Sequence, residues 1–197
     1  MECCRVPDKD KAPHSVSEIL VAAFIAASAM GTLEAFLPII AKAKNINTGL
    51  PIVYICFGVS IAFGRIVGGR GVDSGRGKIL SLSGLALAAA AAIGILIARE
   101  LVSLCVIAGL FGVGIGACNS SFISSLAKGA SESQLGSRMG WLGFSNDLGL
   151  GIGAGLAGMV AQRNVLNVPY LTVTLLIATL ALLLAEGRVF RSRQPTG

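Results

Sequence analysis

Residues 64–78 have the sequence GRIVGGRGVDSGRGK, in which glycines alternate with basic residues and a single aspartate. Apolar runs flank this stretch on both sides, and they predict helices at about 49–69 and 79–98. A helix needs about 20 apolar residues to cross the hydrocarbon of a bilayer, so both helices are long enough. We therefore expect the charged stretch to be a loop that emerges at a membrane surface between two spanning helices.

The composition excludes an ordinary soluble protein. Of the 197 residues, 54% are hydrophobic and 13% are charged, whereas soluble domains carry roughly 25% charged residues. So few charges cannot coat a surface that faces water, and we expect an integral membrane protein. The formal net charge of +6 suggests a nucleic-acid partner only in a soluble domain. Here the positive residues lie between apolar runs, so no nucleic-acid partner is expected.

Six apolar runs predict an all-α membrane protein with six transmembrane helices. The runs lie at about 16–41, 49–69, 79–98, 101–127, 139–162 and 169–186. We divide the chain into a polar cytoplasmic arm at 1–14, a six-helix transmembrane domain at 15–190 and a cytoplasmic tail at 191–197. Small residues let membrane helices approach closely, and the fourth run carries them at Gly109, Gly112, Gly114 and Gly116.

The distribution of lysine and arginine predicts the orientation, because cytoplasmic loops of membrane proteins are enriched in these residues. With six spans, both termini share one side of the membrane with the second-to-third and fourth-to-fifth connections. That side carries 12 of the 16 lysine and arginine residues, namely Arg5, Lys9, Lys11, Arg65, Arg70, Arg76, Lys78, Lys128, Arg138, Arg188, Arg191 and Arg193. The other side carries Lys42, Lys44, Arg99 and Arg163. We therefore expect both termini of this multi-pass protein in the cytoplasm. We also expect its membrane to be a bacterial inner (plasma) membrane.

Charged residues inside the apolar runs are candidates for function, because a charge at the centre of a spanning helix costs about 2.5–3.5 kcal/mol. Asp147, next to Asn146, lies about eight residues and hence about 12 Å into the fifth predicted helix. The hydrocarbon half-thickness is about 15 Å, so we expect a buried carboxylate near the midplane. Beside the glycine-rich run 149–155 it suits a substrate or proton-coupling site. The alternative is a structural carboxylate bonded to a neighbouring helix or to the cytoplasmic loops.

Two other charged residues lie within the predicted spans. Glu34 is about 26 Å into the first helix at 1.5 Å per residue, which places it near the outer interface. We consider it a candidate for a cavity-lining or gating role. Arg65 lies within one turn of the cytoplasmic end of the second predicted helix. We interpret it as an anchor, since arginine can extend its charged end to the interface.

Motifs for nucleotide binding, metal binding and catalysis find no support. Residues 153–158, GAGLAG, match the sequence motif G-x-G-x-x-G of a nucleotide-binding loop. That loop needs a preceding strand, whereas this stretch lies within a predicted spanning segment. No cysteine or histidine spacing matches a zinc site, so neither a metal nor another cofactor is expected. The one histidine, His14, lies in the polar arm. No pair of nucleophile and base therefore indicates an enzyme.

The charged stretch resembles the signature loop of the major facilitator superfamily, G-x-x-x-D-R-x-G-R-R, which joins two spanning helices on the cytoplasmic side. Gly69 and Asp73 match its first part, Ser74 stands in place of the usual basic residue, and Arg76 and Lys78 follow. The resemblance implies that these charges lock the two halves of a transporter in one conformation. Asp73 would then be the acidic member of the lock, and Arg76 and Lys78 the basic members.

Further stretches resemble the C-terminal six-helix half of that superfamily. Residues 34–40, EAFLPII, resemble the end of the helix that opens this half. Residues 136–140, GSRMG, and 144–153, FSNDLGLGIG, resemble its penultimate helix. The implied fold is one half of the family's helix bundle, built as a 3+3 inverted repeat. The arm at 1–14 then resembles the remnant of a central cytoplasmic loop.

The resemblance also implies a function. Members of the family hold their substrate at the midplane between two six-helix halves that rock about it, usually driven by protons. Within the family, sequence motifs of this kind are commonest among efflux pumps. We therefore expect proton-linked efflux of a small solute by antiport, with a second six-helix half or another copy of this chain as the partner. The alternative is a non-transporting membrane protein, either a remnant or an assembly subunit that retains the half-fold.

Overall fold

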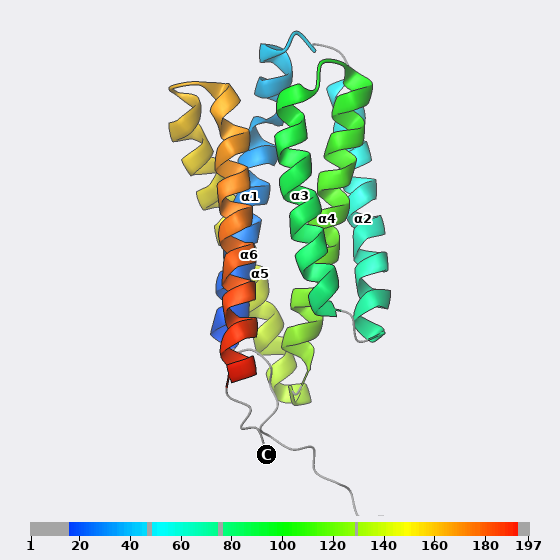
Figure 1. The fold of residues 1–197 in the computed structure, drawn as a ribbon, viewed down its shortest axis with the longest axis vertical. Coiled ribbons are helices and arrows are strands. Elements are labelled where there is room, and N and C mark those ends of the chain that lie inside the picture. Colours follow the sequence, from blue (N-terminus) through cyan, green and yellow to red (C-terminus); the bar gives the residue numbers. More distant parts are fainter. Residues whose placement is uncertain (1–15, 47–48, 75–76, 129, 193–197) are drawn as a thin grey trace, which may run out of the picture.

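The computed structural model describes residues 16–46, 49–74, 77–128 and 130–192. These residues form six long helices and one short 3-10 helix, namely α1 (Val16–Ala43), α2 (Leu50–Asp73), α3 (Gly77–Ile97), α4 (Leu101–Ala127), α5 (Glu132–Ala161), η1 (Val165–Asn167) and α6 (Val168–Ser192). The long helices stand side by side in a bundle (Figure 1). The predicted arm at 1–14 lies outside the described residues, as do residues 193–197 of the predicted tail.

Five segments of the described chain are long and apolar enough to cross a membrane, namely Val16–Ala43, Leu50–Val72, Ile79–Ile97, Leu101–Ala127 and Val165–Leu184. They confirm the prediction of an all-α, multi-pass membrane protein. The remaining long helix, α5, has 30 residues but is not among these segments. Asn146, Asp147 and the many glycines of α5 lower its hydropathy, so its length suits a span and its composition alone does not.

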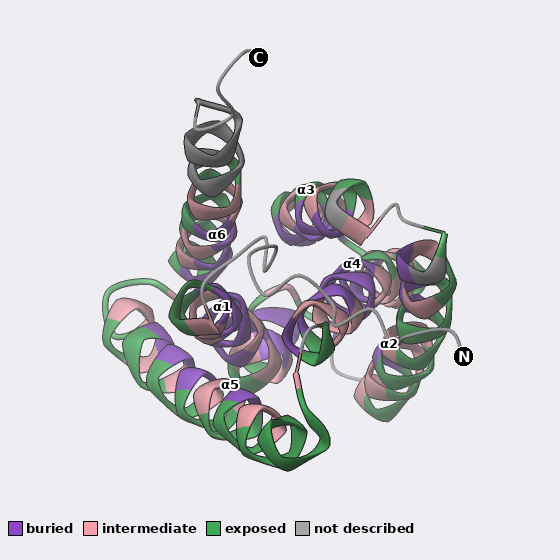
Figure 2. Ribbon diagram, turned by 90° about the horizontal axis from the view of Figure 1, so that it is seen from below, coloured by how far each residue is buried: buried purple, intermediate pink, exposed green. Residues whose placement is uncertain are grey.

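The bundle has three layers, which Figure 2 shows end-on. α1 and α4 lie in the centre, with α3 and α6 on one side and α2 and α5 on the other (Figure 2). α1 contacts both α5 and α6, and α4 contacts both α2 and α3. The two central helices are accordingly rich in buried residues. α2 instead exposes a row of apolar side chains, including Ile55, Val59 and Phe63, as a lipid-facing helix does.

Glycines make the closest helix contacts. Gly149 and Gly153 of α5 lie against the backbone of α1 at Phe24 and Ser28, where an added Cβ atom would collide with a carbonyl oxygen. α2 and α4 meet in the same way through Gly64, Gly112 and Gly116, while Gly68 lies against Ser120 and Ala117 of α4. α4 meets α3 where Gly114 lies against Gly84. The predicted role of glycine spacing in the fourth run is therefore confirmed. Small residues at these positions let van der Waals contact hold helices together within a bilayer.

Short polar side chains add hydrogen bonds between the layers. Thr32 Oγ1 of α1 is 2.6 Å from Thr172 Oγ1 of α6, and Ser145 Oγ of α5 donates to the carbonyl of Leu20 in α1 at 2.7 Å.

At one end of the bundle, Lys44 Nζ donates to the carbonyls of Leu96 at 2.6 Å and Ala98 at 2.8 Å. Burial, followed by the charge of Arg99, lowers the pKa of Lys44 from its ordinary value. This lysine ties the α1–α2 connection to the end of α3.

Two helices extend beyond their predicted bounds, each into a stretch that the sequence analysis expects to be a loop. α2 continues through Asp73, so Gly69 and Asp73 form its last turns and are not part of a loop. No proline interrupts the chain there, and the N–H of Ser74 bonds to the carbonyls of Arg70 and Val72, which closes the helix. α5 begins at Glu132, within the predicted loop at 128–138, because the Ser131 carbonyl accepts bonds from the next turn.

Candidate functional site

A cavity of about 200 Å³ lies between α1, α2, α4 and α5. Its apolar lining comes mainly from α1 and α4, including Met30, Ile115 and Phe122, and α5 adds Leu150. Its polar lining consists of Arg65 from α2, Asn119 from α4, and Asn146 and Asp147 from α5. Three helices, α2, α4 and α5, thus bring one cation, one carboxylate and two amides to a single cavity.

The structure brings the predicted residues Asp147 and Asn146 together in the lining of this cavity. Asn146 is half-buried, whereas Asp147 is exposed in the single chain. The expectation of a buried carboxylate is not met, because no described helix covers the face of α5 that carries Asp147. Within the described part of the chain, the Asp147 side chain has neither a hydrogen bond nor an ion pair. The structural alternative, a bond to a neighbouring helix, is therefore not seen among those residues.

Arg65 lines the same cavity, which the sequence analysis did not anticipate. Because α2 continues to Asp73, Arg65 lies about 12 Å from the end of the helix at 1.5 Å per residue, and not within its last turn. Its backbone carbonyl accepts a hydrogen bond from Ser120 Oγ of α4 at 3.0 Å, which fixes this part of α2. Its guanidinium has no hydrogen bond or ion pair among the described residues.

Asn119 is the second lining residue that sequence reasoning missed. Its Oδ1 atom is buried and, among the described residues, has no hydrogen-bond partner. Leaving a buried acceptor unsatisfied costs about 1–3 kcal/mol, which favours a role in holding a ligand or a water molecule. The available signal was a lone amide within the otherwise apolar and small-residue run of α4.

Glu34 does not share this site. It is half-buried in α1 and lines a separate cavity of about 10 Å³, next to Tyr54 and Phe57. Tyr54 Oη donates to the backbone carbonyl of Glu34 at 2.8 Å. A cavity of that size is at the lower limit for one water molecule, which needs roughly 10–15 Å³. The structure thus places Glu34 apart from Asp147, and a gating role for it stays a prediction.

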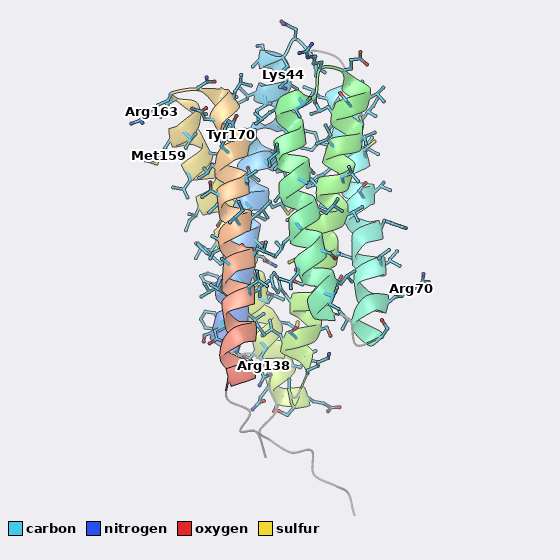
Figure 3. The ribbon with its side chains drawn as sticks, viewed as in Figure 1. Lys44, Arg70, Arg138, Met159, Arg163 and Tyr170 are labelled. Atoms are coloured by element: carbon cyan, nitrogen blue, oxygen red, sulfur yellow. The ribbon has the colours of Figure 1, made fainter. Side chains whose placement is uncertain are left out.

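The structure describes the predicted lock residues only in part. Gly69 lies in α2, and an added Cβ atom there would meet nothing within 4 Å. Asp73 ends α2 and Lys78 follows the first residue of α3, but their side chains, and all of Arg76, lie outside what the structure describes. The nearby Arg70 and Arg138 lie toward one end of the bundle, whereas Lys44 and Arg163 lie toward the other (Figure 3).

The described residues contain no group of three or more histidine, cysteine, aspartate or glutamate side chains arranged to hold a metal ion. The cavity offers charges and hydrogen-bonding groups from its own side chains. Its wall toward α2 carries the cation and its wall toward α5 the carboxylate. Such an arrangement can bind a small polar solute or a proton within a membrane.

Comparison with known proteins identifies the family. A comparison with curated proteins finds no match to this chain. The family described as Major Facilitator Superfamily, by contrast, matches residues 19–196. That match covers all six long helices almost completely, and it agrees with the signature-like stretch at 64–78 and with the apolar helices. The chain therefore belongs to the Major Facilitator Superfamily of membrane transporters.

Proposed function

We propose that this chain is one half of an alternating-access transporter that exports a small solute in exchange for protons. Membership of the superfamily implies membrane transport of a solute. The observation that carries the finer proposal is the convergence of Arg65, Asn119, Asn146 and Asp147 on one cavity. Asp147 is its acidic group, and it lies in the one long helix whose composition is too polar for an ordinary span. On this view the chain is a transporter component and not an enzyme.

We further propose that α5 is a sixth span and that the helices form a 3+3 inverted repeat. α1 lies against α5 as α4 lies against α2, and α1 lies against α6 as α4 lies against α3. This correspondence relates the first three helices to the last three.

With six spans, the excess of lysine and arginine on one side supports cytoplasmic termini, in a bacterial inner membrane. Four residues of the signature stretch are proposed as the conformational lock of the transporter, namely Gly69, Asp73, Arg76 and Lys78.

A partner half is proposed to cover the layer that contains α2 and α5. On α5, added Cβ atoms at Gly136, Gly140, Gly143, Gly151 and Gly155 would meet nothing within 4 Å, and the same holds for Gly58 and Gly69 on α2. Membrane helices use small residues where backbones approach one another. The cavity lies between these two helices, so a second six-helix half, or another copy of this chain, would complete it.

The test measures whether Asp147 couples protons to transport. The purified chain is reconstituted into vesicles with an imposed pH gradient, and accumulation of radiolabelled amino acids, sugars and organic acids is followed. We expect Asp147→Asn to abolish gradient-driven accumulation, because the variant has no carboxylate to take up and release a proton. Glu132→Gln is the matched control, since Glu132 is an exposed carboxylate in the first turn of the same helix.

Two results would decide against this proposal. Unchanged gradient-driven accumulation by Asp147→Asn would remove its coupling role. A purified chain that stays monomeric and moves none of these solutes would favour the alternative, a non-transporting membrane remnant or assembly subunit that retains the half-fold.

A further inference from the structure

We infer that the cavity binds a zwitterionic solute with an apolar body, the chemical class of the aliphatic α-amino acids. The inference rests on the proposed transport function and deepens it by naming the substrate class. Three observations on the described residues carry it, namely two charges of opposite sign without an ion pair there, a buried acceptor without a donor there, and an apolar lining.

The first step is the charge balance of the cavity. Arg65 and Asp147 both line it, yet neither side chain has an ion pair among the described residues. Unpaired charges inside a membrane are expensive, and such residues normally pair with each other or mark a substrate pathway. A solute with one charge satisfies only one wall of the cavity. A zwitterion satisfies both, with its carboxylate at the Arg65 guanidinium and its ammonium at the Asp147 carboxylate.

The second step is the unsatisfied acceptor. The Asn119 Oδ1 atom is buried and has no hydrogen-bond partner in the described structure, so a donor from a bound molecule or from a water molecule would satisfy it. An ammonium group has three N–H donors, enough for both Asp147 and Asn119. A carboxylate has none. A ligand with a protonated amine therefore fits this acceptor better than a purely anionic solute does.

The third step is the remaining lining. Ala23, Ala26, Ala27 and Met30 of α1 and Ile115 and Phe122 of α4 supply an apolar floor, which favours an aliphatic body over a sugar. The volume of about 200 Å³ is below the roughly 300–1,000 Å³ of pockets that bury drug-sized ligands. The part of the cavity that this chain supplies therefore suits a small solute.

The experiment compares three probes that share one body and differ in charge. L-leucine carries both charges, 4-methylpentanoate only the carboxylate, and 3-methylbutylamine only the ammonium. Binding to the purified chain in lipid nanodiscs is measured by calorimetry at fixed pH and salt. We expect L-leucine to bind at least about tenfold more tightly than either single-charge probe, since each charge-assisted hydrogen bond removed has that order of effect.

Variants assign each charge to its partner. Arg65→Gln is expected to weaken L-leucine and 4-methylpentanoate about tenfold and to leave 3-methylbutylamine unchanged. Asp147→Asn is expected to show the reverse selectivity, weakening L-leucine and 3-methylbutylamine only. Glu34→Gln is the control, because Glu34 lines a different cavity. Helical circular dichroism and thermal unfolding of every variant verify that the bundle has folded.

Several outcomes would overturn the inference. They are equal binding of all three probes, tightest binding of either single-charge probe, no binding of any, and equal effects of both variants on every probe. The binding pattern is independent of transport. Transport of a different solute without L-leucine binding would overturn this inference alone, whereas selective L-leucine binding by a chain that transports nothing would overturn the proposed function alone.

Discussion

The two faces of α5 use the same residue in opposite ways. On the face toward α1, Gly149 and Gly153 lie so close to the neighbouring backbone that a Cβ atom would collide with it. On the other face, Gly143 and Gly151 have open space around the Cβ position, and Asp147 lies exposed between them. The first set is explained by contacts inside the chain. The second set has the same helix-pairing composition without a helix in the described structure to pair with.

The contrast teaches that glycine content alone does not reveal which contacts a membrane helix makes. Lipid tails are as apolar as leucine side chains, so helices gain little from hiding apolar surface and associate through close backbone contact and hydrogen bonds. A face that is rich in glycine and also carries a charge is poorly suited to lipid. The open face of α5 therefore supports a partner, and substitutions on the two faces should have different consequences.

The largest expected effect is at Gly153. A valine there would drive its Cβ atom into the Ser28 carbonyl of α1, and backbone cannot move aside as a flexible side chain can. Overpacking of this kind costs about 1–3 kcal/mol and occasionally more. We expect Gly153→Val to lower the free energy of unfolding by at least that amount, as measured by denaturant titration in detergent micelles with circular dichroism.

Gly151→Val is the matched control for that measurement. Gly151 lies two residues away in the same helix and has nothing within 4 Å of its Cβ position. Valine is a better helix former than glycine, so this variant should be at least as stable as the parent chain. Equal destabilisation by both variants would contradict the distinction between the two faces.

The second effect concerns association and not folding. Gly143 is exposed, with open space at its Cβ position, so Gly143→Leu should change the free energy of unfolding by no more than about 0.5 kcal/mol. If a second copy covers this face, leucine blocks close approach of the helices. We expect at least a fivefold loss of energy transfer between donor-labelled and acceptor-labelled copies in vesicles. Full association by the Gly143→Leu variant would exclude this face from the contact.

Much of the fold was predictable from the sequence because apolar run length is a direct consequence of bilayer thickness. The spacing of Gly112, Gly114 and Gly116 also predicted close contact, and each of them does face a neighbouring helix. Helix ends were less predictable. α2 and α5 continue into polar stretches, because their ends are determined by backbone hydrogen bonds around Ser74 and Ser131 and not by hydropathy.

The candidate site was also predictable only in part, because the sequence alone does not reveal where a helix ends or which of its faces meets a neighbour. Asp147 and Asn146 were found because a charge in an apolar run is conspicuous. Arg65 was interpreted as an anchor because its depth depends on where α2 ends, and that end, Asp73, lies about one turn beyond the predicted end at residue 69 at 3.6 residues per turn. Asn119 required knowledge of which face of α4 meets the cavity. Whether Asp147 is covered depends on neighbours that one helix cannot reveal.

The smallest effect tests a contact between helices that uses hydroxyl groups in place of glycine. Thr32 of α1 and Thr172 of α6 are both fully buried, with their Oγ1 atoms 2.6 Å apart. In Thr32→Val, the Thr172 hydroxyl keeps its bond to the carbonyl of Val168 at 3.2 Å, so no donor is left unsatisfied. We expect Thr32→Val to lower the free energy of unfolding by about 0.6 kcal/mol, the average for interhelical hydrogen bonds in membranes.

Thr174→Val is the control, because exposed Thr174 bonds within its own helix to the Tyr170 carbonyl. A loss as large as that of Gly153→Val would mean that hydroxyl contacts, and not glycine contacts, chiefly hold this bundle together.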